Sequence, residues 1–240
     1  MSVLSMTKHL LQSTIRLDRD VKKLRYPILV SGLPGIGFVG NIAAVHIIRK
    51  LSAEKFGEVY SPHFQDTVYS SVNGSFRRPI IEFHVCSLPN NDRDLIIIYG
   101  NTQPLTNYGQ YEVSQKILDQ VYELGCRSIV SLAGLKQEYV GEQPRVFCVA
   151  SGFEQMEKVL PKGVNPLQGC VYGMAGLLVG LSRLKGMQGI CLLSETLGIF
   201  PDPSAAKAVL EKLSSIYGFH LDISDLAETT KEVANNILTS

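Results

Sequence analysis

The sequence has few charged residues and none of the motifs that usually accompany hydrolysis or phosphate transfer. Charged residues make up 19% of the 240 residues, and the formal net charge is +1. A chain this close to neutral has no strongly basic face, so neither nucleic acid nor an anionic membrane is an expected partner. The chain also lacks a G-x-S-x-G nucleophile elbow, a G-x-x-x-x-G-K-[ST] phosphate loop and an H-E-x-x-H zinc helix. These absences argue against an enzyme.

Cysteine is scarce, and long apolar runs are missing. No C-x-x-C pair occurs, so we expect neither a zinc knuckle nor a redox dithiol, and we interpret the cysteines as core thiols in a reducing compartment. They are Cys86, Cys126, Cys148, Cys170 and Cys191. The longest apolar stretch, 171–181, is too short to span a bilayer, and residues 1–12 lack the apolar core of a signal peptide. A soluble, cytoplasmic protein is expected.

The residues that are present suffice for one large core. Hydrophobic residues make up 45% of the chain, whose length is at the upper end of a single domain. Residues 1–25 combine charges with scattered apolar positions, and they predict a loosely attached extension with one short edge strand or helix. Residues 26–240 then form a single α/β domain. Low charge and 21 glycines predict a partly apolar surface suited to subunit contacts.

Apolar runs alternate with helical patterns from residue 94 onward, which predicts a mostly parallel α/β sheet. Asn107 is the expected N-cap of one helix, and Asp202, followed by proline, that of another. The helix predicted over 172–184 is apolar almost all round and contains three glycines. Each interior glycine costs a helix about 1 kcal/mol relative to alanine, so close packing against the sheet or another subunit must offset them.

An Asn73-Gly74 turn predicts a hairpin that joins a strand over 68–72 to a strand over 78–88 within the sheet. In the second strand Glu82, His84 and Cys86 alternate onto one face. Successive residues of this kind lie about 6.5 to 7 Å apart, and one ion would need further ligands from elsewhere. We interpret them as the polar face of a partly covered strand and assign no metal.

A cluster of glycines over 32–40 follows the first apolar run. Helical spacing resumes after Gly37, which predicts a strand–turn–helix corner too tight for side chains. Gly35-Ile-Gly37-Phe-Val-Gly40 also has the G-x-G-x-x-G spacing of dinucleotide-binding loops. That fingerprint requires an acidic residue ending the next strand, and Glu58 lies in a segment unsuited to a central strand. We favour close helix–sheet packing and leave an anion or peptide contact open.

Two separated segments carry a family resemblance. The first is Gly-Leu-Pro-Gly-Ile-Gly-Phe-Val-Gly at 32–40, and the second is Leu-Ser-Glu-Thr-Leu-Gly-Ile-Phe-Pro-Asp-Pro-Ser-Ala-Ala-Lys-Ala-Val-Leu at 193–210. In this order they resemble the proteasome assembly chaperone 2 family, in its archaeal and bacterial single-domain form. The resemblance implies a three-layer αβα fold with a mostly parallel mixed sheet, related to phosphorylases and hydrolases. It further implies a homo-oligomer that helps to assemble proteasome α-subunits, and no known catalytic activity or cofactor.

In a sheet of this kind ligands bind beyond the carboxyl ends of the strands, where four loops should converge. The candidate crevice comprises Pro34, Gly35, Gly37, Gly40, Asn101, Gln103, Gly134, Glu195 and Thr196. Its one carboxylate, Glu195, suits a general base or a ribose ligand, as in phosphorylases, or a cap for the turn before Gly198. We favour the cap. None of these loops supplies an arginine for phosphate, and we assign no catalytic residue.

Two functions follow. The favoured one is a non-catalytic, homo-oligomeric assembly factor or scaffold whose partners are proteasome α-subunits or other assembly clients. The alternative is a nucleoside- or nucleotide-binding enzyme of phosphorylase-like fold, or an ATP-grasp-type ligase. Studied chaperones of the family are similar in ending with a hydrophobic residue, a tyrosine and one last residue, which insert between α-subunits. Here Leu238 fits the first position, but Thr239 replaces the tyrosine, so we expect α-subunit binding that is weak or independent of the tail.

Overall fold

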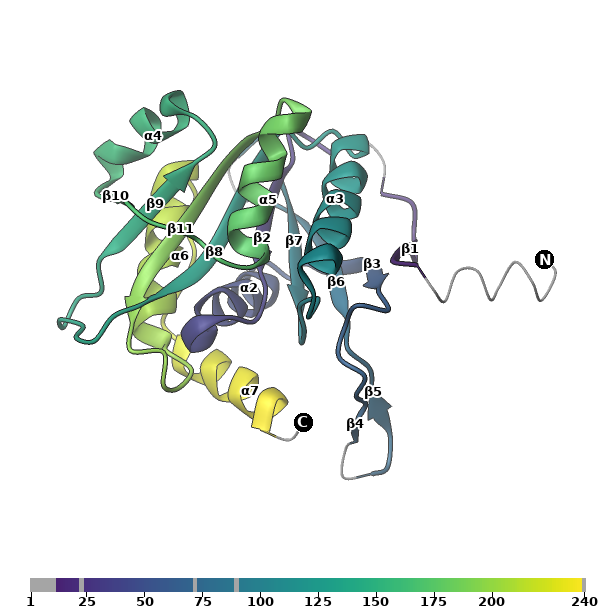
Figure 1. The fold of residues 1–240 in the computed structure, drawn as a ribbon. Helices are drawn as coiled ribbons and strands as arrows, with labels where there is room; N and C mark the ends of the chain where they lie inside the picture. The colour runs from purple at the N-terminus through teal and green to yellow at the C-terminus, as the bar shows by residue number, and fades with distance from the viewer. Residues whose placement is uncertain (1–11, 22–23, 71–72, 89–90, 239–240) are drawn as a thin grey trace.

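The computed structural model describes residues 12–21, 24–70, 73–88 and 91–238. Within these ranges a nine-stranded mixed sheet has helices on both faces (Figure 1). The strand order is β1-β3-β6-β7-β2-β8-β11-β9-β10. The predicted three-layer α/β architecture is therefore confirmed, whereas the expected relation to phosphorylases stays a prediction. Thr239, on which the tail prediction rests, lies outside the described residues.

The centre of the sheet is a block of four parallel strands. These strands are β7 (Asp94–Gly100), β2 (Ile28–Gly32), β8 (Ser128–Lys136) and β11 (Gln188–Thr196). Leu29 of β2 lies opposite Ile96 and Ile129 in register, and all three enter the core beneath one helical layer. Val30, the next residue, enters the core on the other face. Because side chains alternate along a strand, continuous apolar runs here fill two separate cores.

The helices divide between these two cores (Figure 1). On one face lie α3 (Asn107–Glu123) and α5 (Met174–Ser182). On the other lie α2 (Val39–Lys50), α6 (Pro203–Tyr217) and α7 (Leu226–Leu238). The short helix α4 (Phe153–Val159) lies near the β9–β10 margin. The described ranges also contain three short 3-10 helices: η1 (Ile36–Phe38), η2 (Leu160–Lys162) and η3 (Arg183–Lys185). In the described part of the chain, no helix combines the length and apolarity needed to cross a membrane.

One predicted helix cap is confirmed and one is wrong. The Asp202 carboxylate accepts a hydrogen bond from the Ala205 amide at 2.9 Å and begins α6 as expected. For α3 the cap is Thr106, whose hydroxyl accepts from the Gly109 amide at 3.0 Å. Thr106 has the extended backbone of a cap residue, and Asn107 is already the first residue of the helix.

Antiparallel strands flank the central block on both sides. On one side are β6 (Ile81–Ser87), β3 (Glu54–Tyr60) and β1 (Thr14–Leu17). On the other, β9 (Val146–Ala150) is antiparallel to β11 and parallel to β10 (Asn165–Pro166). The parallel order expected from residue 94 onward thus breaks at β9, because the connection over 137–145 contains no crossover helix. The strand β1 is an outermost strand of the sheet, in a segment where the sequence predicted one short edge strand or helix.

The predicted hairpin exists but does not join the sheet. The strand β4 (Tyr69–Ser70) pairs with β5 (Phe76–Arg77) as a separate two-stranded ribbon, which projects from the sheet in Figure 1. The Asn73 side chain accepts a hydrogen bond from the Ser75 amide at 3.0 Å and shapes the turn. Pro79 then interrupts the strand pattern, because proline has no N–H to donate. The following strand, β6, pairs with β3 and β7 instead.

The cysteine thiols are all free, and four of them match the expected core positions. Cys126, Cys148 and Cys191 are buried and Cys86 is partly buried. Burial raises the pKa of the Cys148 thiol to about 12, so it is protonated at neutral pH. Cys170 is exposed in the connection that leads to α5, and its interpretation as a core thiol is wrong.

Candidate functional site

The glycine corner between β2 and α2 is filled by the protein's own backbone. A Cβ atom at Gly32 would overlap the carbonyl oxygen of Gly40, and one at Gly40 would overlap that of Leu132 in β8. Helix α2 therefore crosses β2 and β8 with backbone against backbone. Gly37 has φ +62°, and a Cβ there would lie 2.7 Å from the hydroxyl of Thr196. These contacts support the close-packing interpretation of the glycine spacing.

Gln103 connects two loops of the candidate crevice. Its amide group donates a hydrogen bond to the carbonyl of Pro34, and its carbonyl oxygen accepts one from the amide of Met174 at 3.1 Å. Gln103 thus ties the glycine corner to the first residue of α5. The side chain has an internal partner at each end.

Asn101 faces a different part of the sheet. Its carbonyl oxygen accepts from the amide of Ile80 at 2.8 Å, and its amide group donates to the carbonyl of Arg78 at 3.2 Å. Asn101 therefore holds the chain that enters β6, on the far side of β7 from β2 and β8. Of the residues predicted to line the crevice, Gln103 and Pro34 are in contact, whereas the Asn101 side chain is bound to the segment before β6.

Glu195 and Thr196 end β11 and are both buried. The Glu195 carboxylate accepts hydrogen bonds from the backbone amide of Arg145 at 3.0 Å and from its guanidinium, whose Nε lies 3.0 Å from Oε1. The side-chain hydrogen bond from Arg145 lowers the pKa of Glu195, so the carboxylate is ionised and engaged at neutral pH. A general base works best with a pKa near the operating pH, and this carboxylate is shifted away from it. The predicted cap of the turn before Gly198 is wrong for Glu195, because the Gly198 amide donates to the Thr196 hydroxyl instead.

Thr196 fastens the loop that follows β11. Its hydroxyl donates to the Asp202 carboxylate at 2.6 Å and accepts from the amide of Gly198 at 3.2 Å. The Asp202 amide in turn donates to the carbonyl of Gly37 at 2.9 Å. Gly134 belongs to the same contact, because a Cβ there would overlap the carbonyl of Ile36. Only Gly35 among the crevice glycines faces open space. As a ligand site the crevice stays a prediction.

A fixed apolar surface lies over this packed corner. Four exposed apolar side chains form this surface, which we call the carboxyl-edge rim: Ile36, Leu197, Ile199 and Phe200. Phe200 is 77% exposed. Gly198 places the loop directly against the side chain of Ile36. The hydrogen bonds of Thr196 and Asp202 hold the loop from within. Clustered exposed apolar side chains on a held loop are typical of a protein–protein contact.

A second apolar surface covers α3 and α5, which pack side by side (Figure 1). A groove of about 410 Å³ runs between them, and no charged side chain lines it. Tyr111 and Tyr172 flank the groove with largely exposed rings, and Gly180 opens its floor. We call this surface the α3–α5 face. Tyrosine enrichment and the absence of charge are features of interface cores.

The polar face of β6 holds no metal-like arrangement. Glu82 and His84 are 3.2 Å apart and hydrogen bonded, and Lys55 binds Glu82 at 2.7 Å. Among the described residues no group of three or more histidine, cysteine, aspartate or glutamate side chains could hold an ion. Cys86, the third candidate, lies on the same face but packs against the core, and burial raises its pKa to about 12.

Sequence reasoning missed the contribution of Arg145. The residue directly precedes β9, and its role depends on the antiparallel pairing of β9 with β11, in which Val146 lies opposite Ser194. This pairing brings Arg145 beside Glu195. No local pattern signals it.

Comparisons with known proteins agree with this fold. The model of the PAC2 family matches residues 29–239. The uncharacterized protein MJ1210 of Methanocaldococcus jannaschii is 32% identical over 218 residues, which cover 90% of this chain and 83% of that protein. Among solved structures, Pyrococcus furiosus PbaB, an archaeal proteasome activator, is similar with a TM-score of 0.84 and 39% identity, over 95% of this chain and 97% of PbaB.

A more distant likeness supports the fold alone. Pyrococcus furiosus PbaA, an archaeal homolog of proteasome-assembly chaperone, has a TM-score of 0.77 and 23% identity, with 94% of both chains covered.

Proposed function

Because the chain belongs to the PAC2 family, we propose that it is a cytoplasmic, non-catalytic factor that forms a homo-oligomer and binds proteasome α-subunits. The observation that carries this proposal is the similarity to PbaB, a proteasome activator, along nearly the whole of both chains. The match of the family model to residues 29–239 supports the division into an N-terminal extension over 1–25 and a single domain over 26–240.

The polar side chains of the crevice are hydrogen bonded within the protein, which supports a function without catalysis. Three of these side chains are hydrogen bonded within the protein: Gln103 to Pro34, Glu195 to Arg145 and Thr196 to Asp202. A catalytic acid, base or nucleophile must reach a substrate atom within hydrogen-bond distance. These three side chains are instead occupied in holding the loops that support the carboxyl-edge rim.

Gly180 supports self-association through the α3–α5 face. A glycine inside a helix costs about 1 kcal/mol relative to alanine, and a compensating contact is expected. Within the protomer nothing lies within 4 Å of the Cβ position at Gly180, so packing inside the subunit does not explain the residue. At Gly176, by contrast, a Cβ would meet the carbonyl of Val171 at 2.5 Å. A second copy that approaches the backbone at Gly180 supplies the missing reason.

The carboxyl-edge rim is the surface we assign to the proteasome. It lies at the ends of the central strands, whereas the α3–α5 face covers one side of the sheet. Both surfaces can therefore be occupied at once. Each exposed side chain of the loop can fill an apolar pocket on the partner; these are Leu197, Ile199 and Phe200. A buried apolar anchor of this kind typically contributes about 2 kcal/mol or more to binding.

The test measures native mass, binding to isolated α-subunits and to the assembled proteasome of the same organism, and peptide hydrolysis by that proteasome. We expect an oligomer whose binding is weakened by Phe200→Ser but not by Phe76→Ser, a matched change of an exposed phenylalanine on β5. Faster α-subunit assembly identifies an assembly factor, and faster peptide hydrolysis identifies an activator. A monomer that binds neither form, or turnover of a nucleoside with phosphate, would overturn the proposal.

A further inference from the structure

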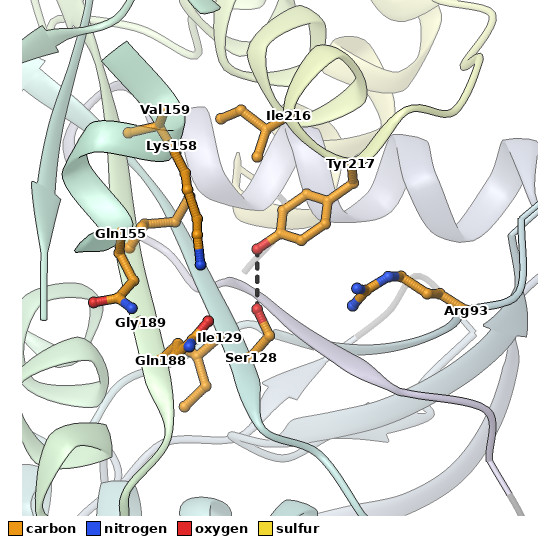
Figure 2. Close-up of a pocket in the computed structure, with 11 residues that line it drawn as sticks. Arg93, Ser128, Ile129, Gln155, Lys158, Val159, Gln188, Gly189, Ile216 and Tyr217 are labelled. Carbon is orange, nitrogen blue, oxygen red and sulfur yellow. Dashed lines mark hydrogen bonds between the residues drawn. The ribbon is translucent and has the colours of Figure 1, made fainter. Parts of the chain in front are cut away.

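A hollow of about 330 Å³ lies at the amino ends of β8 and β11, at the opposite edge of the sheet from the predicted crevice (Figure 2). Helix α4 forms one wall and the last turn of α6 another. Arg93, just before β7, closes a third side. The size lies within the range of small-molecule sites.

Two cations face this hollow, and no acidic side chain lines it. Figure 2 shows the Lys158 ammonium and the Arg93 guanidinium pointing toward its centre from opposite sides. Arg93 has no ion pair or side-chain hydrogen bond with any residue in the described ranges. Lys158 binds Glu154 at 2.7 Å, one turn earlier on α4, and an ammonium has further donors to offer. The electrostatic character of the hollow is therefore positive in a protein of net charge +1.

Two hydroxyls stand between the cations. Tyr217 Oη and Ser128 Oγ are 3.1 Å apart and share one hydrogen bond, drawn dashed in Figure 2. Only one of the two protons is used in that bond, so the other hydroxyl can donate to a ligand. Burial raises the pKa of Tyr217 to about 12, and its proton is retained at neutral pH. The side-chain amides of Gln155 and Gln188 line the same hollow.

The remaining lining is apolar. Val159, Ile190 and Ile216 contribute hydrocarbon surface between the strands and the two helices. Inorganic phosphate would leave this surface uncovered, whereas a molecule with a flat or hydrocarbon body would cover it. Pockets that combine an apolar wall with a few convergent polar groups are typical of small-molecule sites.

We propose that this hollow binds a small organic anion, with its phosphate or carboxylate group between Arg93 and Lys158 and its apolar body against the isoleucines. The Tyr217–Ser128 pair donates the remaining hydroxyl proton to the anionic head group. This site is independent of the proteasome-binding function proposed above, since it uses neither the α3–α5 face nor the carboxyl-edge rim.

The test is a titration of the full chain, labelled at isoleucine methyl groups, with phenyl phosphate, benzoate, inorganic phosphate and the neutral benzyl alcohol. We expect saturable shifts at Ile190 and Ile216 with an aromatic anion, at a Kd of about 1 mM or below, and at least about tenfold weaker binding of benzyl alcohol. The tighter of phenyl phosphate and benzoate identifies the head group.

Arg93→Gln and Lys158→Gln should each weaken binding about tenfold, whereas Lys158→Arg should retain it. Lys207→Gln, an exposed cation near the opposite end of α6, is the matched control and should change Kd less than about twofold. All these side chains are exposed, so the variants keep the fold. Absence of saturable shifts, equal binding of benzyl alcohol, or binding unaffected by both glutamine variants would overturn the proposal. If inorganic phosphate bound as tightly as phenyl phosphate, the proposed contact between an organic body and the apolar wall would be wrong.

Discussion

The Glu195 carboxylate is held by Arg145 from two directions, with Oε2 3.0 Å from the backbone nitrogen and Oε1 3.0 Å from the guanidinium Nε. Glu195 is 3% exposed, whereas the Arg145 side chain is 67% exposed. The pair fastens the start of β9 to the end of β11. Arg145 thus covers a buried charge with a group that itself remains largely in water.

The first prediction concerns this pair. Glu195→Ala should lower the free energy of unfolding by about 1 to 3 kcal/mol, because the partly buried Arg145 amide loses its acceptor. Urea unfolding measures the change. Glu142→Ala, an exposed carboxylate in the same connection, is the control and should stay within about 0.5 kcal/mol. Equal stability of the two variants would show that the pair is not structural.

The second prediction concerns the glycine corner. Gly37→Val should impair folding, since φ +62° strains a β-branched residue by about 1 to 3 kcal/mol and the side chain would collide with Thr196. Gly35→Val is the matched control, because Gly35 has φ −171° and nothing near its Cβ position. Thermal melting and soluble yield report the difference. Soluble Gly37→Val protein with the melting temperature of the parent would contradict the packing interpretation.

The third prediction concerns self-association. Gly180→Lys should weaken association by about tenfold or more, because it places a charge in a desolvated contact. The protomer itself should tolerate the change, since the Cβ position is open. A dilution series followed by native mass measures the effect, with Gly141→Lys, equally open in the connection after β8, as the control. A monomeric parent, or oligomers equally stable in both variants, would place the interface elsewhere.

The fourth prediction concerns acid stability. The hydrogen bond from His84, with help from Lys55, lowers the pKa of Glu82 from 4.5 to about 2, against the opposing effect of burial. A carboxylate with a depressed pKa in the folded state stabilises the fold fully above its unfolded pKa, and this contribution is lost as pH falls through the folded pKa. The protein should therefore lose stability between about pH 4.5 and pH 2.

Glu82→Gln should flatten part of this slope in urea unfolding measured across the same pH range. Glu211→Gln removes an exposed carboxylate on α6 and should leave the slope nearly unchanged. A slope that is identical in the parent and in Glu82→Gln would show that other carboxylates govern acid unfolding.

Features set by neighbouring residues could be predicted from the sequence. Asp202 next to proline defines the start of α6, and the apolar run of β7 defines a central strand. The glycines of 32–40 indicated a close backbone contact, although its partner, Leu132, could be identified only from the fold. The same local logic failed at Thr106 and Asn107, because either side chain can cap a helix and the backbone geometry decides between them.

Features that depend on topology could not be predicted. Arg93 and Lys158 meet at one hollow only because α4 folds back over the amino ends of β8 and β11. The rule for parallel sheets pointed to the opposite edge, where Glu195 and Thr196 proved to have internal partners. The pairing of β9 likewise reversed an expected direction and brought Arg145 to an edge where no arginine was expected.

The outermost strand β10 limits how copies of this chain can associate. It contains two residues, Asn165 and Pro166, and it pairs only with β9 in the described structure. A proline on an exposed edge removes a donor, and so short a strand gives an incoming strand almost nothing to extend. Growth of the sheet from one molecule into the next is thereby blocked at this margin. Copies that meet at this margin must do so through side-chain surfaces.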